Sequence, residues 1–427
     1  MTREQKKYIM EFRDDILWEI ISRLPLKFVV QCKLLSKNIN SMISHPEFAQ
    51  NLYQRHKDIS TQLIYSINDW RLFRQFHKIS LNPITQYVTT LCYDIDILAS
   101  CNGLNLFDIE ILASCNGLIL FDFEKIRRYC VFNPTTGEHQ LIPYPMSSFA
   151  HDLERTGLAV DYPNSDQYKL VTISSLIKNS NLFYKFHILS SERSGLWHEI
   201  QLRTNTFTSL PSSSPPVYWR DSLYWLRSDG SVIAFDTNRE EAILIDRPEF
   251  LDHFDLSYGK ISTGEDIWLG RAQGLLTLVC IFRKFVVIAT YDSASSRWRV
   301  SQTFDNFVLS PEGTIIGFPV WIDSKQVSFL VERLSTQYHD LYEYDTEINK
   351  YKNAAVLDTV NYPMFCVHQT LACVHKTPSN NVTTADQTYI AAKLDLIRRF
   401  IMEGISIQEE SSSGQSSAAA DVGGEEK

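Results

Sequence analysis

The chain has 427 residues, of which 44% are hydrophobic and 12% aromatic, and its formal net charge is −9. This length and apolar content suit one large β architecture plus a small helical module, and they exclude a disordered or fibrous protein. The negative charge and the lack of a long lysine and arginine stripe argue against nucleic acid or an anionic membrane as the main partner, because both bind concentrated positive surfaces. Protein partners are the better hypothesis.

The N-terminal residues 1–7 are polar and charged, and no apolar signal-peptide region follows them. We therefore expect the protein to be intracellular, in the cytoplasm or the nucleus. The most apolar stretch, residues 275–289, is interrupted by Arg283 and Lys284, whereas a membrane-spanning helix needs about 20 apolar residues. This stretch predicts two strands of a hairpin and no membrane span.

Eight cysteines are scattered along the chain without a Cys-x-x-Cys pair, which is typical of small buried residues in a reducing compartment. Cys366-Val-His368 and Cys373-Val-His375 repeat a Cys-x-His pattern with four candidate zinc ligands. The same alternation arises in a half-buried strand. We favour the strand and predict no metal site and no cofactor.

The first helical signal begins at Asp14 and Asp15, and Pro25 ends it because its ring clashes with the preceding turn. Apolar residues between them have the spacing of one helix face: Ile16, Leu17, Ile20, Ile21 and Leu24. A second helix is predicted over residues 28–35, and a third starts at residues 44–47, which have capping-box spacing. Three short helices bury little surface, so they need either a partner protein or the following domain against their apolar side.

Residues 14–27 resemble the first half of an F-box, whose pattern runs Leu-Pro-x-Asp-Leu-x-x-Glu-Ile-Leu-x-Arg-Leu-Pro-x-Lys. The matching positions hold Asp15, Ile16, Glu19, Ile20, Arg23, Leu24, Pro25 and Lys27, and in the second half Ser36, Lys37, Ile43, Pro46 and Phe48. Two departures from the pattern are Phe12-Arg13, where the family has Leu-Pro, and Ile39, where it usually has Trp. These departures affect the expected strength of partner binding more than its existence. The resemblance implies an F-box over residues 10–56.

From about residue 85, short apolar runs alternate with Asp, Asn, Ser, Gly and Pro, which is typical of β structure. A hairpin recurs, because strands end at turn residues Asn133, Ser190, Asp236, Asp292 and Asp345, spaced by 57, 46, 56 and 53 residues. Asn and Asp suit such turns because their side chains bond the backbone two residues on. The spacing is near the fifty-residue period of a kelch-type blade. It predicts a kelch-like β-propeller or an open relative, with an irregular β-sandwich as the alternative.

Further motifs resemble the F-box-associated interaction domain that is typical of plant F-box proteins. They are residues 114–118, 133–138, 157–161 leading to Tyr168-Lys169, and 223–225 with 233–236. Their order is specific, and with the F-box the resemblance covers about residues 10 to 376. It implies an F-box-associated kelch-like β domain over residues 85–376.

The end of the chain shows a helical pattern at Ile390, Leu394, Ile397 and Ile401, which predicts an amphipathic helix over residues 385–404, lying on the propeller. Residues 409–427 consist mainly of Ser, Ala, Gly and Glu, a composition that cannot offset its ordering entropy by burial, and they are expected to be a disordered tail. The predicted fold class is therefore α+β, with a small helical F-box, a mainly β domain and a C-terminal helix.

The sequence has none of the GxxxxGK[ST], GxGxxG, GxSxG or HExxH motifs, and we predict a non-catalytic protein. The resemblance implies an adaptor of an SCF (Skp1-cullin-F-box) E3 ubiquitin ligase. The F-box would bind a Skp1-type linker and, through it, cullin, while the β domain would hold a protein substrate for ubiquitination and degradation. The alternative is a propeller enzyme or sugar-binding propeller with an unrelated helical N-terminus. The residues expected to form or shape the linker-binding surface are Ile16, Leu17, Ile20, Leu24, Pro25, Leu26 and Val29.

Residues 94–108 and 108–122 are nearly identical at a period of fourteen, far shorter than a blade repeat. This is either a local tandem duplication or an error in the gene model. An even period preserves the inward and outward parity of a strand. The second copy has the usual family distance to Asn133-Pro134, so we expect Gly117 and Leu118 to lie in the native blade.

Deleting residues 94–107 should leave folding and partner binding largely intact, because the entropy of loop closure grows slowly with loop length. The thermal midpoint of the deletion variant measures this. Aggregation of the variant would mean that the first copy belongs to the core.

Overall fold

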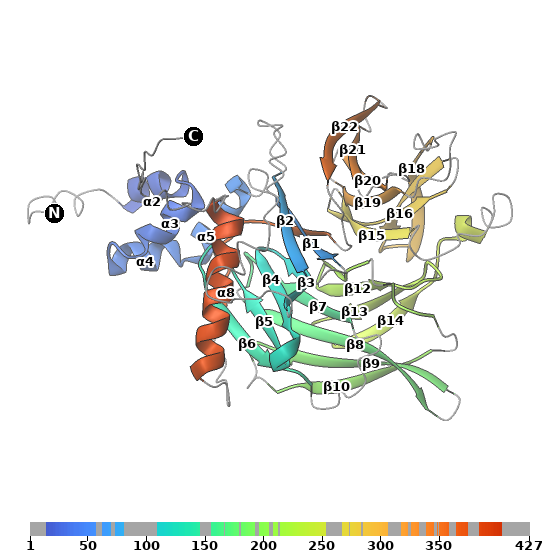
Figure 1. Cartoon of the computed structure of the whole chain (residues 1–427), viewed down its shortest axis with the longest axis horizontal. Coiled ribbons are helices and arrows are strands. Elements are labelled where there is room, and N and C mark those ends of the chain that lie inside the picture. The colour runs from blue at the N-terminus through green and yellow to red at the C-terminus, as the bar shows by residue number, and fades with distance from the viewer. Residues whose placement is uncertain are drawn as a thin grey trace, which may run out of the picture.

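The structure is a computed structural model (Figure 1). It describes residues 14–56, 62–69, 73–80, 109–145, 155–165, 167–178, 181–192, 196–204, 208–211, 214–252, 267–272, 274–282, 285–305, 317–322, 326–332, 339–345, 348, 350–357, 364–374 and 384–403. The first copy of the duplication and the predicted tail at 409–427 lie outside these residues.

Four short helices form the N-terminal module: α2 (Asp14–Ser22), α3 (Leu26–Cys32), α4 (Lys37–Ile43) and α5 (Pro46–His56). The sequence pattern predicts only three helices, so α4 is an additional helix. The signal for α4 is Ser36, whose Oγ caps the helix by accepting the N–H of Ile39 at 3.1 Å. Ile39 and Ile43 then provide the buried face of α4.

The rest of the described chain is mainly β, in five sheets of four antiparallel strands and one sheet of three. The four-stranded sheets are β3 (Ile109–Cys115), β4 (Leu118–Phe123), β5 (Arg128–Phe132) and β6 (His139–Pro143); β7 (Arg155–Val160), β8 (Tyr168–Lys178), β9 (Asn181–Ser190) and β10 (His198–Thr204); β11 (Val217–Trp219), β12 (Ser222–Leu226), β13 (Val232–Asp236) and β14 (Glu241–Ile245); β15 (Ile267–Ala272), β16 (Leu275–Ile281), β17 (Phe285–Asp292) and β18 (Arg297–Asp305); and β19 (Gly317–Ile322), β20 (Gln326–Glu332), β21 (His339–Asp345) and β22 (Lys350–Leu357). The inner strands pack in the order β3, β7, β11, β15, β19, which is a propeller-like arrangement.

The five recurring turns each join the third and fourth strand of a sheet, as the sequence predicts. The side chain of each turn residue accepts a hydrogen bond from a backbone N–H group two or three residues further along the chain. The N···O distances are 2.8 Å to Oδ1 of Asn133, 2.8 Å to Oδ1 of Asp236, 3.0 Å to Oδ1 of Asp292, 3.2 Å to Oδ1 of Asp345 and 3.3 Å to Oγ of Ser190. The repeat that the turn residues predict is therefore the repeat of the four-stranded sheets.

The three-stranded sheet combines both parts of the chain in the order β2, β1, β23. Strand β1 (Gln62–Asp69) pairs with β2 (Phe73–Ser80) and with β23 (Met364–Val367), and β23 in turn packs on β3. The β structure therefore begins before residue 85, where the sequence analysis placed its start. Strands β1 and β2 form a local hairpin, and only the pairing of β1 with β23 joins segments about 300 residues apart in the chain.

The second copy of the duplication forms the β3–β4 hairpin, so Gly117 and Leu118 lie in a blade as expected. Its turn has positive φ at Asn116 (44°) and Gly117 (88°), a conformation that suits Asn-Gly. Gly117 is also required sterically, because a Cβ there would lie 2.0 Å from Oγ1 of Thr370.

The segment after β23 is anchored by the Asn133 turn. The buried Nδ2 of Asn133 donates to the carbonyls of Thr370 (3.2 Å) and Ala372 (2.7 Å). In the same turn, Glu138 accepts the N–H of Val374 at 3.1 Å. This turn therefore ties the end of the propeller to its first complete blade.

Helix α8 (Thr384–Glu403) lies along the β3–β6 sheet (Figure 1). All four residues of the predicted apolar stripe are buried, and they share a core with Ile119, Phe121 and Phe132. Arg398 of α8 donates to the carbonyl of Pro134 at 3.1 Å. The predicted amphipathic helix on the propeller is thus present.

The predicted hairpin at 275–289 is formed by β16 and β17, which pair antiparallel. Among the described helices, none combines the length and apolar character that a membrane span needs. Cys366 of the Cys-x-His pattern lies in β23. In the part of the chain that the structure describes, no three His, Cys, Asp or Glu side chains cluster as metal ligands would.

Substituting Asn133 with alanine should lower the free energy of unfolding by about 3 kcal/mol, because two buried carbonyls lose their donor in addition to the turn bond. Asp236→Ala is the matched control, since it removes the same type of turn bond in a different blade and should cost about 1 kcal/mol. Urea denaturation measures both values. Equal losses would mean that the bonds to Thr370 and Ala372 contribute nothing.

Candidate functional site

The residues expected to face a linker protein fall into three groups. Ile16 (44% exposed) and Ile20 (49%) lie one turn apart on α2 and are open to solvent, and Pro25 before α3 is also exposed. Leu17 and Leu24 are half-buried. Leu26 and Val29 are buried inside the helical module, so they can shape a binding surface but cannot touch a partner.

Three further exposed apolar residues were missed by the sequence analysis: Phe28 (51% exposed), Leu34 (88%) and Leu35 (62%). Phe28 lies on α3, and the leucine pair follows the end of that helix. The available signal was an apolar pair in a turn, between Lys33 and Ser36, where the pattern of a folded domain places polar residues.

We name Ile16, Ile20, Phe28, Leu34 and Leu35 the F-box apolar face. These five are half of the ten large hydrophobic residues with the greatest exposure in the described part of the chain, yet they fall within twenty residues of sequence. Isolated exposed apolar residues are normal on a protein surface, but a concentration of them marks an interaction site. The face is therefore the first candidate site.

Hydrogen bonds also connect α2 with α5. Glu19 of α2 accepts hydrogen bonds from Arg23 (2.7 Å) and from Arg55 of α5 (3.1 Å). Both bonds hold the pKa of the Glu19 carboxyl below its ordinary value, and the bond from Arg23 has the larger effect. Because the folded-state pKa of Glu19 is lowered, the contribution of these bonds to stability is present above the ordinary pKa. It is lost as the pH falls through the lowered value.

An aromatic contact also joins α2 and α5. Trp18 packs edge-on against Phe48, with ring centroids 5.0 Å apart.

The helical module shares one hydrophobic core with the propeller. Buried residues of α5, such as Phe48 and Leu52, belong to the same cluster as Leu118 of β4 and Val160 of β7. Leu371, Ala372 and Val374, which follow β23, also lie in this cluster. Continuous packing of this kind joins the two domains as one body, since protein interiors are close-packed and resist deformation.

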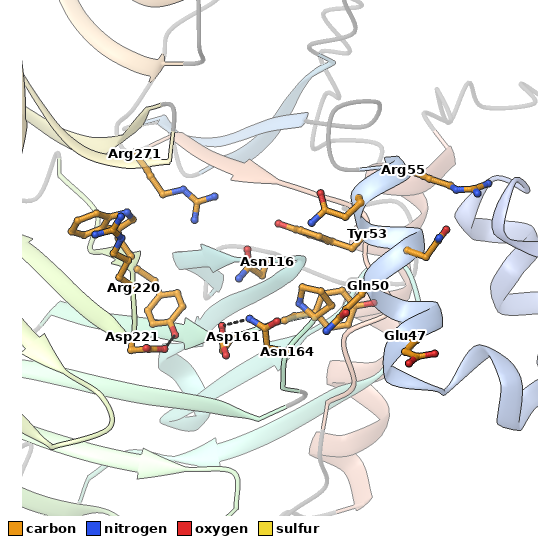
Figure 2. Close-up of a pocket in the computed structure, with 16 residues that line it drawn as sticks. Glu47, Gln50, Tyr53, Arg55, Asn116, Asp161, Asn164, Arg220, Asp221 and Arg271 are labelled. Atoms are coloured by element: carbon orange, nitrogen blue, oxygen red, sulfur yellow. Dashed lines mark hydrogen bonds between the residues drawn. The ribbon is translucent and has the colours of Figure 1, made fainter. Parts of the chain in front are cut away.

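A pocket of about 1060 Å³ lies where α5 meets the propeller (Figure 2). Its walls come from α5, the β3–β4 turn, the loop after β7, the β11–β12 turn and β15. Asn116 of the β3–β4 turn is held by a 2.6 Å hydrogen bond from its Nδ2 to the carbonyl of Val160. On the α5 wall, Tyr53 packs edge-on against Tyr162, with ring centroids 5.8 Å apart.

The two aspartates of the pocket each accept a bond from a neutral donor. Asp161 accepts from Nδ2 of Asn164 at 3.2 Å, and Asp221 accepts from the hydroxyl of Tyr218 at 3.4 Å. Burial, together with the charge of Asp221, raises the pKa of Tyr218, so its hydroxyl stays protonated and remains a donor.

Three arginines line the pocket, and Arg55 among them pairs with Glu19. The other two have no acidic partner in the described part of the chain. Arg220 lies over the ring of Trp219, with 4.7 Å from its Cζ to the ring centroid, and donates to Ser293 at 3.1 Å. Arg271 is exposed on β15 and forms no ion pair with any described residue. The pocket lining thus contains three arginines and three carboxylates, those of Glu47, Asp161 and Asp221. Arg271 forms no ion pair with any of these carboxylates, so its guanidinium is open to an external anion.

Cys115 lies next to this pocket, at the end of β3. Although the residue is partly exposed, burial around its thiol raises the pKa to about 12. The protonated thiol is a poor nucleophile at neutral pH.

The fold and these two sites define a class: a helical docking module built into a propeller-like β domain. Comparison with protein families agrees, because residues 14–51 match the F-box domain and residues 70–263 match the F-box associated beta propeller domain. The chain is thus a plant-type F-box protein with an F-box associated propeller domain, homologous to F-box and kelch-repeat proteins of Arabidopsis.

Three similar proteins of Arabidopsis thaliana illustrate the relationship. An F-box/kelch-repeat protein is 27% identical over 79% of this chain and 71% of its own length. A second F-box protein is 26% identical over 53% of each chain, and a third is 23% identical over 68% of this chain and 70% of its own.

Similarity to solved structures is weak. A chain of the mitotic checkpoint complex has a TM-score of 0.33 at 13% identity, covering 59% of this chain and 66% of its own. Oligogalacturonate lyase in complex with manganese has a TM-score of 0.35 at 10% identity, covering 68% and 73%. Neither value supports an argument about function.

Because the core is shared, we predict that Leu52→Ala destabilises both domains together, at a cost of about 2 to 5 kcal/mol. Hydrogen exchange should rise both in α2–α5 and in β7. Asn40→Ala, on the exposed side of α4, is the control and should change neither region. A rise confined to the helices would contradict the shared core.

Proposed function

We propose that this protein is the substrate-recognition adaptor of an SCF E3 ubiquitin ligase. In this role the F-box binds a Skp1-type linker and, through it, cullin, and the β domain holds a protein substrate for ubiquitination and degradation. The observation that carries the proposal is the F-box apolar face, because a short helical module exposes it while its opposite side is built into the propeller core. The family match supports the same role.

The adaptor performs no bond chemistry in this proposal. Its contribution is proximity, since it raises the effective concentration of a substrate lysine near the ubiquitin-charged enzyme of the complex. The shared core suits this task because it keeps the linker-binding face and the substrate-binding domain in one orientation. The place of action is intracellular, in the cytoplasm or the nucleus.

Ile16, Ile20 and Pro25 remain proposed contact residues, with Phe28, Leu34 and Leu35 added. Leu17 and Leu24 contribute their exposed edges, and Leu26 and Val29 support the surface from within. The alternative, a propeller enzyme or sugar-binding propeller, has no observation in its favour among the described residues.

The double substitution Ile20→Ala, Leu34→Ala should weaken binding to a purified Arabidopsis Skp1-type linker by about thirtyfold or more, because truncating an interface anchor costs about 2 kcal/mol. Both side chains are exposed in the free protein, so its melting temperature should not change. Biolayer interferometry gives the Kd.

The matched control is Ile243→Ala, Leu244→Ala, which removes two exposed apolar side chains from β14 and should leave the Kd unchanged. If the F-box variant binds the linker as the parent protein does, the adaptor proposal fails.

A further inference from the structure

The pocket between α5 and the propeller has features of a recognition site for an anionic peptide. Its volume of about 1060 Å³ is at the upper end of typical ligand pockets, and it exceeds what a single side chain fills. It lies at the junction of the two domains, between α5 and residues in or next to the inner propeller strands β3, β7, β11 and β15 (Figure 2). A segment bound there would be held close to the module that docks the ligase.

The first argument is charge. Figure 2 shows Arg271 and Tyr53 pointing into the same space from opposite walls, with Arg220 on the Arg271 side. Three carboxylates also line the pocket, those of Glu47, Asp161 and Asp221. None of them forms an ion pair with Arg271, and the two aspartates accept hydrogen bonds from Asn164 and Tyr218. A guanidinium in this setting favours a carboxylate or phosphate, which it can bind through two parallel hydrogen bonds.

The second argument is the α5 wall. Gln50, Asn51 and Gln54 of α5 all line the pocket and are exposed, and their side chains form no hydrogen bond with another described residue. Carboxamides both donate and accept, which matches the alternating N–H and C=O groups of an extended peptide. Trp219 and Tyr53 add aromatic surface for a side chain that flanks the anion.

We propose that this pocket binds a segment of a client protein with an anionic side chain on Arg271, the peptide backbone on the α5 carboxamides and a flanking residue against Trp219. The proposal rests on the adaptor function and names its substrate class. The anion is a carboxylate or a phosphate, which share this chemistry.

The probes are four fluorescein-labelled twelve-residue peptide pools, degenerate except at one central position that holds glutamate, phosphoserine, glutamine or lysine. Fluorescence anisotropy with the full chain measures each Kd. We expect the glutamate or phosphoserine pool to bind at least about tenfold more tightly than the glutamine and lysine pools. Preference for one anionic pool over the other identifies the source of the anion.

Arg271→Gln should remove this preference, and Arg271→Lys should retain part of it. The control is Arg297→Gln, which removes an arginine of β18 that is also exposed and forms no ion pair with any described residue; it should keep the preference. Equal binding of all four pools, no binding of any pool, or an Arg271→Gln protein that still prefers anions overturns the proposal.

Failure of this proposal can be told apart from failure of the adaptor proposal. Arg271 lies on β15 and takes no part in the F-box apolar face, so Arg271→Gln should bind the Skp1-type linker with unchanged Kd. The Ile20→Ala, Leu34→Ala protein should conversely keep its preference for anionic pools.

Discussion

The structure depends on one hydrophobic core that the F-box helices share with the first blades of the propeller. Without it, four short helices of 7 to 11 residues would bury too little surface to be stable alone. From the sequence, either a partner protein or the following domain could cover the apolar side of these helices. Each alternative applies to different residues. Phe48 and Leu52 are buried in the core that the helices share with the propeller, whereas Ile20 and Leu34 stay exposed.

The β3–β6 sheet is where the distant parts of the chain meet. Strand β4 is buried on both faces, with Leu118 and Leu120 towards the F-box core and Ile119 and Phe121 towards α8. The Asn133 turn in the same sheet holds the segment after β23 through hydrogen bonds that span more than 230 residues of sequence. One blade thus supports the F-box, the C-terminal helix and the sheet made from both parts of the chain.

The two candidate sites differ in their chemistry. The F-box apolar face offers leucine, isoleucine and phenylalanine side chains, which suits a large hydrophobic interface. The pocket offers arginines, carboxamides and aromatic rings, which suits a short polar segment. Since both are attached to one core, a bound client and a bound linker would keep a fixed separation, as proximity catalysis requires.

Sequence alone determined the features that depend on neighbours in the chain. These features are the first F-box helix, which ends before Pro25, the five blade turns, the apolar stripe of α8 and the hairpin turn at Gly117. All of them follow from local periodicity or turn chemistry. The tertiary structure decided the rest: which F-box residues are exposed, the pairing of β1 with β23, and the placement of Arg271 across the pocket from Tyr53. These depend on contacts between residues that lie far apart in sequence, and no local pattern encodes which distant surface a side chain will meet.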